Sequence, residues 1–569
     1  MRLSRRQFLK STTRAGVGAA LALAPRATWA APASGRTLVP YPQAYHANQP
    51  EGWAEKDIKR GGTLTVAFRG DPPHYDPALT TSYYMLGAVG PVYDRLIRPK
   101  WGSYANPSTP ELVPDLAERW EISPDRLVYT FHLRRGVRWQ KLPPVNGREF
   151  VADDVKFTLE RARGKALDFL VAPVKAIEAP ERYTVRITLK ERSPGFFPNL
   201  GSCYAFMTPR QVVDRDGDLK KTLIGTGPFI LKEHVPKTSL TYERNPDFRD
   251  AGQPYLDRFR IVIMPDDATQ IAAFRAGEID YFDTNELEAI KGILASHPKT
   301  VVHKFHIPAA SFHVAFRLDQ KPFNDVRVRR AISMAINREE MNALVYGGQG
   351  RPYSIGIPWP AVFDAWPGSE AYGPYYRYDP RRAKTLLQEA GLGQGFKSKL
   401  VFFAYGDDRI LQCELIQNYL AAIGIQVEVA RLDYGVWIDQ YLKGNYEAMA
   451  LGFTVPAGGM ELGHDWTYDL MHCKGVKNSW HLCDPELDRL LDAAREELDS
   501  GRRRTIFRRV WDMETQNVYR AYIAQEVRYN IWHPWMKNTI GWTGYRFDQF
   551  TYGSSHVRSV WLDPALRGR

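Results

Sequence analysis

The chain has 569 residues, too many for one hydrophobic core, and its composition of 44% hydrophobic and 25% charged residues is that of a globular protein. The formal net charge is +12, but six basic and no acidic residues fall within the first thirty positions. The remaining excess is mild, so the charge gives no support for nucleic-acid binding.

The N-terminal segment has the order of features found in export signals. Residues 4–10 read SRRQFLK, which fits the twin-arginine pattern, and a weakly apolar stretch and small residues follow. We expect residues 1–30 to be a twin-arginine signal peptide, with cleavage after Ala33 as the alternative. The apolar stretch is too short to span a bilayer, so the mature protein is expected to be soluble and periplasmic. The twin-arginine route exports proteins that are already folded, and some of them carry a cofactor inserted in the cytoplasm. A periplasmic enzyme with a cofactor is therefore the alternative function.

The first clear elements of the mature chain are a strand and a block of helix, hairpin and helix. Residues 61–68 read GGTLTVAF and predict a strand. In the block that follows, residues 115–120 predict a short acidic helix, and residues 128–133 and 136–139 predict a pair of strands. The dipeptide Asn146-Gly147 predicts a tight turn, and an apolar stripe at helical spacing predicts a helix from residue 151 to 162.

This block carries a family resemblance. The runs PDLAERWEISPDRLVYTFHLRRGVRW (114–139) and NGREFVADDVKFTLERA (146–162) resemble the signature of the family 5 extracellular solute-binding proteins. The resemblance implies an α/β fold of the type II periplasmic binding proteins, two-lobed and hinged, large with an extra subdomain, and with mixed sheets flanked by helices. It also implies a solute delivered to the permease subunits of an ABC importer. In that family the block is scaffold and does not identify the ligand.

The resemblance also implies the division into domains. After the signal peptide of 1–30, lobe I is expected to comprise residues 31–85, 224–310 and 528–569. The extra subdomain of lobe I is expected at 86–223, and lobe II at 311–527.

The second half of the chain alternates strands and helices. Helices are predicted at residues 267–276, 378–392, 410–423 and 487–522, and strands at 399–408, 425–433 and 527–533. A further helix carries Arg327, Arg329, Arg330 and Arg338, which we interpret as a solvated basic face.

Four cysteines in an oxidising compartment raise the question of a disulfide. Cys473 and Cys483 are close enough in sequence to close a short loop, and the family resemblance implies a bridge of similar span there. A metal site formed with His472 and His481 is the alternative, although the spacing fits no known zinc pattern. We expect the disulfide and no metal. Cys203 and Cys413 are expected to be buried thiols.

The ligand region is expected between Leu432 and His464, which resembles the family's W…G…GW…D segment. The resemblance implies that Tyr434 and Phe453 stack on the ligand. Peptide binders then carry an acid that receives the α-ammonium, whereas this chain reads Val-Pro-Ala at 455–457. A buried ammonium without a carboxylate is costly, so a peptide with a free N-terminus is not expected unless Glu461 or Asp465 substitutes.

The full set of expected ligand contacts joins these two rings to five other residues. It comprises Tyr83, Tyr84, Tyr405, Tyr434, Phe453, Met460 and His464. A Tyr83 packed under its loop and a structural His464 are the alternatives at those positions.

We expect a binding protein and not an enzyme. No HExxH, GxSxG or Walker pattern occurs in the sequence, and no cofactor is expected. The expected function is capture of a solute by hinge closure and delivery to an ABC permease, by a monomer that binds no nucleic acid. Aromatic rings and Met460 in place of charge favour an apolar, aromatic or sugar-like solute, and an oligopeptide and a metal chelate are the alternative ligands.

Overall fold

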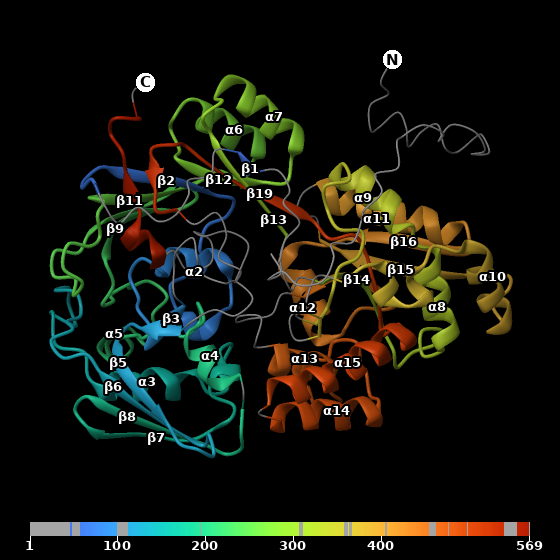
Figure 1. The fold of residues 1–569 in the computed structure, drawn as a ribbon, viewed down its shortest axis with the longest axis horizontal. Coiled ribbons are helices and arrows are strands. Elements are labelled where there is room, and N and C mark those ends of the chain that lie inside the picture. The colour runs from blue at the N-terminus through green and yellow to red at the C-terminus, as the bar shows by residue number, and fades with distance from the viewer. Residues whose placement is uncertain are drawn as a thin grey trace. The chain divides into compact units, whose positions relative to one another are not determined.

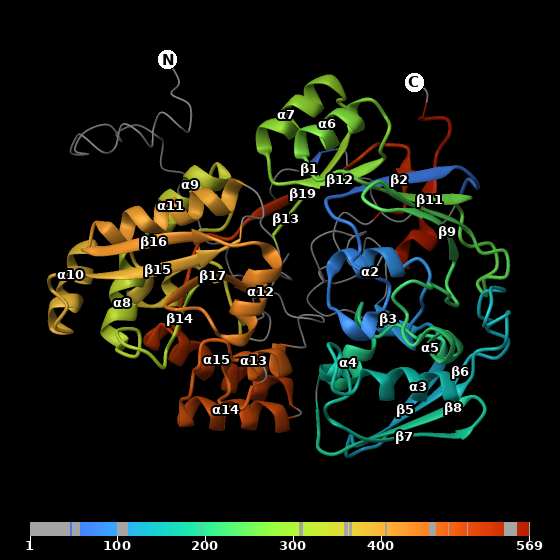
Figure 2. The same cartoon turned by 180° about the vertical axis from the view of Figure 1, so that it is seen from behind.

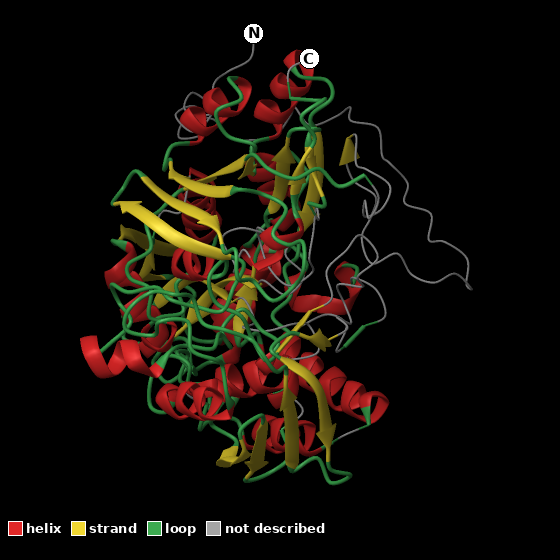
Figure 3. Ribbon diagram, turned by 90° about the vertical axis from the view of Figure 1, so that its left-hand side faces the viewer, coloured by secondary structure: helices red, strands yellow, loops and turns green. Residues whose placement is uncertain are grey.

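The computed structural model describes residues 46–47, 57–99, 112–193, 195–306, 311–357, 362–363, 367–403, 407–454, 463–475, 477–497, 499–539 and 555–567. The expected signal peptide, Tyr405 and Met460 lie outside these residues. Among the residues described, none of the helices has both the length and the apolar character needed to cross a membrane. Figure 3 shows helices lying against strands throughout the described chain.

The largest sheet has eight strands. Their order is β1 (His46–Ala47), β13 (Val301–His306), β19 (Val527–Trp532), β12 (Tyr281–Thr284), β2 (Thr63–Phe68), β11 (Arg258–Ile263), β10 (Ser239–Arg244) and β9 (Phe229–Val235). β2 is parallel to β11 and β12, and the other pairs are antiparallel. The strands predicted near residues 61–68 and 527–533 are therefore confirmed. Helices α2 (Tyr83–Val89), α6 (Asp267–Arg275) and α7 (Leu287–Ser296) belong to this part of the chain.

The four-stranded antiparallel sheet corrects part of the prediction for the first block. Its order is β5 (Ala117–Ile122), β6 (Val128–Leu133), β8 (Thr184–Leu189) and β7 (Val174–Glu181), and α3 (Ala152–Ala162) contacts β7 and β8 (Figure 1). The acidic helix predicted at 115–120 is wrong, because this segment pairs with β6 as β5. Residues 136–139 contribute only an isolated bridge between Arg138 and Glu149. The Asn146-Gly147 turn is confirmed by φ values of 55° and 73°.

The five-stranded sheet belongs to the second half of the chain. Its order is β16 (Ile425–Arg431), β15 (Phe396–Phe402), β17 (Met449–Thr454), β14 (Ser311–Phe316) and β18 (Arg520–Tyr522). β15 is parallel to both β16 and β17. The helices here are α8 (Val326–Ala335), α9 (Arg338–Tyr346), α10 (Pro380–Glu389), α11 (Asp407–Ala421), α12 (Tyr434–Lys443), α13 (Gly463–Met471), α14 (Pro485–Glu496) and α15 (Ser500–Asn517) (Figure 2). The single helix predicted at 487–522 is thus two helices and the strand β18.

The remaining elements are short. They are β3 (Ile97–Pro99), β4 (Leu112–Pro114), β20 (Met536–Lys537), β21 (Trp561–Leu562), α4 (Phe196–Leu200) and α5 (Arg210–Asp216), with 3-10 turns at Pro77–Leu79, Asp168–Leu170, Ser369–Tyr372, Pro374–Tyr376 and Ser555–Ser559. β3 pairs with β4, and β20 pairs with β21.

Buried side chains form two hydrophobic cores. One surrounds the five-stranded sheet and extends to α6 and α7, and the other joins the four-stranded sheet to much of the eight-stranded sheet. The chain leads from β13 of the eight-stranded sheet to β14 of the five-stranded sheet, and residues 523–526 lead back from β18 into β19. Two connecting segments of this kind are the usual form of a hinge.

The basic face predicted near α8 is partly wrong. Arg329 is only 6% exposed and Arg338 only 1% exposed. The Arg338 guanidinium donates to the carbonyl oxygens of Tyr522, Ser333 and Tyr376 at 2.7 to 3.0 Å. Backbone carbonyls from three separate segments accept hydrogen bonds from this guanidinium group. Arg338 therefore joins α9 to β18 inside the core.

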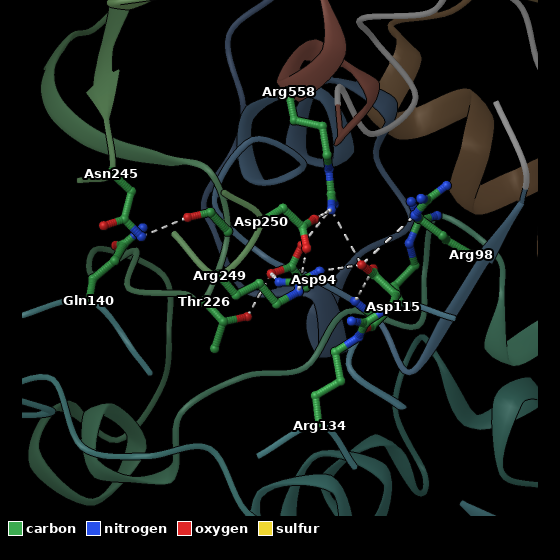
Figure 4. Close-up of polar contacts among 12 residues, drawn as sticks. Asp94, Arg98, Asp115, Arg134, Gln140, Thr226, Asn245, Arg249, Asp250 and Arg558 are labelled. Carbon is green, nitrogen blue, oxygen red and sulfur yellow. Dashed lines mark hydrogen bonds and ion pairs between the residues drawn. The ribbon is translucent and has the colours of Figure 1, made fainter. Parts of the chain in front are cut away.

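A largely buried group of charges, of which only Asp250 is partly exposed, anchors the C-terminal segment (Figure 4). We call it the C-terminal charge cluster; it comprises Asp94, Asp115, Arg249, Asp250 and Arg558. Arg558 lies in the 3-10 turn at 555–559, and its Nη2 donates to Asp94 Oδ1 at 2.9 Å. Arg249 pairs with both Asp94 and Asp115. The cluster therefore ties residues distant in sequence to the core that contains the eight-stranded sheet.

The disulfide between Cys473 and Cys483 is confirmed, with a Cα–Cα distance of 4.6 Å. A disulfide sulfur is no longer a thiolate, so the alternative in which Cys473 and Cys483 both bind a metal does not hold while the disulfide is formed. Cys413 is buried, as predicted, and burial raises the pKa of its thiol. Cys203 is only half-buried, so the prediction for it is wrong in degree.

Candidate ligand-binding region

The three parallel strands of the five-stranded sheet end at a position where ligands commonly bind. The chain leaves β15, forms α11 and returns as β16 on one side, whereas β17 pairs with the other side of β15. The sequence order of the strands therefore reverses at β15. In open α/β sheets, the crevice outside the carboxyl ends of the strands at such a reversal is the usual ligand site.

Two of the predicted contact residues fall at these carboxyl ends. Tyr434 is the first residue of α12, directly after β16, and Phe453 lies next to the end of β17. Tyr405 belongs between β15 and α11, outside the described residues. In the β-sheet register, Phe453 is opposite Phe312 of β14. The backbone therefore brings the positions of the two predicted stacking rings to one edge of one sheet.

The other predicted contacts fall on separate elements. His464 is the second residue of α13, and Tyr83 and Tyr84 begin α2. Met460 and the segment 455–457 lie outside the described residues. The ring of Tyr84 lies 6.2 Å from that of Phe68, and a Cβ added to Gly70 would lie 2.6 Å from the Tyr84 ring. Glycine at position 70 thus permits the tyrosine to pack on the end of β2.

The parallel strands of the eight-stranded sheet also end in charged residues. Arg69 follows β2, and Asp283 lies near the end of β12. Arg69 Nε donates to Asp267 Oδ1 at 2.9 Å, and Arg69 Nη1 donates to Asp283 Oδ1 at 3.0 Å. Burial opposes ionisation of Asp283, but Arg69 and Arg528 outweigh burial and lower the pKa of this carboxyl.

From Asp283 the charges continue along the connecting segment between the sheets. Arg528 Nη1 donates to Asp283 Oδ2 at 2.5 Å, and Arg528 Nε donates to Glu526 Oε1 at 3.3 Å. Glu526 Oε2 then lies 3.6 Å from Arg409 Nη2, in the first turn of α11. We call Arg69, Asp283, Arg528, Glu526 and Arg409 the interlobe charge chain.

Arg409 brings this chain next to the edge where Phe453 lies. Its guanidinium carbon is 3.9 Å from the ring centroid of Phe312, close enough for a cation–π interaction, and its Nη1 donates to Gln412 Oε1 at 2.9 Å. The neighbouring Asp408 is different, because neither of its shielded carboxylate oxygens has a hydrogen-bond partner in the described part of the chain. Burial raises the pKa of Asp408 to about 6.

Aromatic rings support the start of α12 from within. Trp437 stacks on Tyr441 with centroids 4.8 Å apart and lies 4.5 Å from Phe403, which follows β15. The Tyr441 hydroxyl and His313 Nε2 are 2.9 Å apart in a buried hydrogen bond. This packing fixes the backbone that carries Tyr434 against the sheet.

The sequence analysis did not single out Asp408, Arg409 or Glu526. The available signal was the position of the Asp-Asp-Arg run, which opens a helix directly after a buried strand of an α/β lobe. Burial of the Asp408 oxygens could not be read from that run.

Comparisons with known proteins agree with this architecture. Residues 111–460 match the model of the bacterial extracellular solute-binding proteins, family 5 Middle. The chain is 30% identical over 477 residues to di/tripeptide-binding protein 2 of Pseudomonas aeruginosa, covering 78% of this chain and 86% of that protein.

Two solved structures extend the comparison. The chain is similar to the ABC transporter-associated periplasmic binding protein DppA from Helicobacter pylori in complex with the peptide STSA, with a TM-score of 0.75, 26% identity, and coverage of 89% of this chain and 98% of that one. It is also similar in fold to the periplasmic binding protein AgaA from A. tumefaciens R10 in complex with agropinic acid, with a TM-score of 0.75, 22% identity, and coverage of 88% and 99%. The two-lobed α/β fold expected from the sequence is thereby confirmed. The chain belongs to the bacterial extracellular solute-binding proteins of family 5, whose members serve ABC importers.

Proposed function

We propose that this protein captures a small solute between lobe I and lobe II in the periplasm, closes about the hinge and delivers the solute to the permease subunits of an ABC importer. The observation that carries the proposal is the convergence of charged and aromatic residues at the carboxyl ends of the parallel strands of two sheets. The interlobe charge chain connects these two edges through Glu526, on the segment that joins the sheets, and Arg528, near the start of β19.

The domain boundaries and the export route form part of this proposal. Lobe I comprises residues 31–85, 224–310 and 528–569, with its extra subdomain at 86–223, and lobe II comprises residues 311–527. Residues 1–30 direct export by the twin-arginine route, and the mature protein acts as a monomer. The relatives are named as binding proteins, which supports binding over cofactor-dependent catalysis.

We further propose that Tyr434 and Phe453 stack on the solute, with Tyr83, Tyr84, Tyr405, Met460 and His464 around it. Ring stacking is worth about 1 kcal/mol per contact beyond the area buried, which suits an aromatic, apolar or sugar-like solute. Because Val-Pro-Ala at 455–457 offers no carboxylate there, a free peptide N-terminus is not held at that position. Peptide is the second candidate ligand, favoured by the ligand names of the P. aeruginosa and H. pylori relatives.

A thermal-shift screen of the mature protein tests the proposal. The screen compares di- and tripeptides, their N-acetyl derivatives, oligosaccharides, metal chelates and aromatic compounds. Because only the folded protein binds, a ligand at a hundred times its dissociation constant is expected to add about 2.7 kcal/mol to the free energy of unfolding and to raise the melting temperature. N-acetylated peptides are expected to bind no more weakly than free ones.

Two results would count against this account. Failure of every solute class to raise the melting temperature contradicts the binding function itself. Micromolar binding of free peptides that disappears on N-acetylation contradicts only the ligand assignment.

A further inference from the structure

The first turn of α11 contains a carboxylate that the protein does not use for its own hydrogen bonding. Both oxygens of Asp408 are shielded from solvent and have no hydrogen-bond partner among the described residues. Buried polar atoms in folded proteins are nearly always paired, so an exception needs an explanation, and a missing ligand is one. Asp408 Oδ1 and Oδ2 are therefore available to accept hydrogen bonds from a solute.

The nearby donors are committed to other partners. Apart from Asp408, the charged and titratable groups that act on this carboxyl are Arg409, Glu526, Arg528 and Tyr346. Arg409 donates to Gln412 and pairs with Glu526, while Arg528 pairs with Asp283 and Glu526. The hydroxyl of Tyr346 accepts a hydrogen bond from Gln412 at 3.1 Å. None of these side chains donates to the Asp408 oxygens, although the backbone N–H of Arg409 also stabilises the ionised carboxylate.

The charge balance of the surroundings points to a cation. The ion pairs around Asp408 join three carboxylates, Asp267, Asp283 and Glu526, to three guanidinium groups, those of Arg69, Arg528 and Arg409. Asp408 belongs to none of these pairs, so it adds one negative charge to a balanced set when it is ionised. Burial raises the pKa of Asp408 to about 6, so the carboxylate is still mostly ionised at neutral pH.

The position of Asp408 places it where a solute is expected. It follows the carboxyl end of β15, at the reversal of strand order, and the adjacent Arg409 lies over the ring of Phe312. Phe312 is opposite Phe453, one of the two proposed stacking residues. A solute that stacks on this edge would therefore carry a substituent toward the start of α11.

We propose that Asp408 accepts hydrogen bonds from a protonated nitrogen of the solute. This inference rests on the proposed function and restricts it to solutes that contain an ammonium or amidinium group. The nitrogen can be the α-ammonium of a peptide or the amine of another compound, and the chemistry at Asp408 is the same in both cases. Asp408 would thus determine which solutes bind. It lies in α11, whereas peptide binders carry their acid at the position of residues 455–457.

Matched ligand pairs and two variants test this inference. The first pair is tyramine and tyrosol, which differ by an ammonium and a hydroxyl group. The second pair is the dipeptide Tyr-Ala and its N-acetyl derivative. Affinities are measured by calorimetry for the wild-type protein, Asp408→Asn and Glu414→Gln. Glu414 is a partly exposed carboxylate on the same helix, so its variant controls for loss of one negative charge.

We expect the wild-type protein to bind the amine of at least one pair tenfold or more tightly than its neutral partner. Asp408→Asn should abolish this preference, and Glu414→Gln should keep it. A preference within the dipeptide pair identifies a peptide α-ammonium as the source and would replace the non-peptide ligand proposed above. A preference confined to tyramine identifies another amine. Below pH 6 the wild-type preference should weaken, because Asp408 then becomes protonated.

The ligand-free proteins supply a second measurement. Above its pKa an unpaired buried carboxylate destabilises the folded state, so Asp408→Asn should raise the melting temperature at pH 7.5, whereas Glu414→Gln should not. The inference is overturned if the wild-type shows no preference for an amine, if the preference survives in Asp408→Asn, or if this variant melts lower than wild type. If solutes still raise the melting temperature in the thermal-shift screen, the proposed binding function stands even when the inference about Asp408 fails.

Discussion

Replacing Arg558 with methionine is expected to lower the free energy of unfolding by about 3–5 kcal/mol. Arg558 is 2% exposed and pairs with Asp94 and Asp115, both of which are also buried (Figure 4). Removal of the guanidinium leaves two buried carboxylates whose remaining ion-pair partners are Arg249 and, for Asp115, Arg98. Since domains are typically stable by 5–15 kcal/mol, this is a large fraction of the total.

The loss should depend on pH in a defined direction. Burial disfavours the charged form of Asp115, but Arg558 and Arg249 outweigh it and hold the pKa of this carboxyl well below its usual value. A depressed pKa contributes stability that is present above the unfolded-state value of about 3.9 and is lost as the pH falls toward the folded-state value. The difference between wild type and Arg558→Met should therefore be largest near neutral pH and should narrow below pH 4.

Urea unfolding of the mature protein at several pH values measures both effects. Arg502→Met is the matched control, because Arg502 is 73% exposed and pairs with Glu497 at the surface. This control should leave the unfolding midpoint almost unchanged. Equal midpoints for Arg558→Met and wild type at pH 7 would show that the C-terminal charge cluster does not anchor the last segment of the chain.

Replacing Glu514 with leucine is the second change expected to have a large effect, again about 3–5 kcal/mol. The side chains of Glu514 and Arg520 are fully buried, and Arg520 Nε donates to Glu514 Oε1 at 2.5 Å. Arg520 also lies 4.5 Å from the ring centroid of Trp480. Without Glu514, a guanidinium charge remains in the core beside aromatic rings, without its carboxylate.

A double-mutant cycle separates loss of the pair from loss of packing. The double variant Glu514→Leu with Arg520→Met removes both charges and is expected to be more stable than Glu514→Leu alone. Urea unfolding of the four proteins gives the coupling free energy. Strictly additive losses would indicate that the two groups contribute independently and that the buried ion pair is not the reason for the destabilisation.

The elements that the sequence predicted well are those whose signals are local. Tyr129, Phe131 and Leu133 alternate with less buried residues and form β6, and Asn146-Gly147 takes the positive φ values of its turn. The segment 115–120 was misjudged as a helix because its acidic composition is local, whereas its pairing with β6 is a tertiary contact. Propensity is a weak prior when a neighbouring strand can supply the backbone hydrogen bonds.

Buried charge was the part that the sequence could not predict. Arg338 resembles an exposed helix arginine in the sequence, and only the fold brings carbonyl oxygens from Tyr522 and Tyr376 to it. The same limit applies to Asp408, whose neighbours Glu526 and Arg528 are more than a hundred residues away in the chain. The predicted ring positions Tyr434 and Phe453 did fall at the carboxyl ends of β16 and β17, on either side of β15, because βα units place the carboxyl ends of parallel strands on one edge.

Small-angle X-ray scattering of the mature protein, with and without a saturating solute from the thermal-shift screen, is the most direct test of capture by closure. The account predicts that the radius of gyration decreases on binding, because two lobes joined by two connecting segments rotate toward each other around the solute. Superimposable scattering profiles for the free and the saturated protein would contradict it.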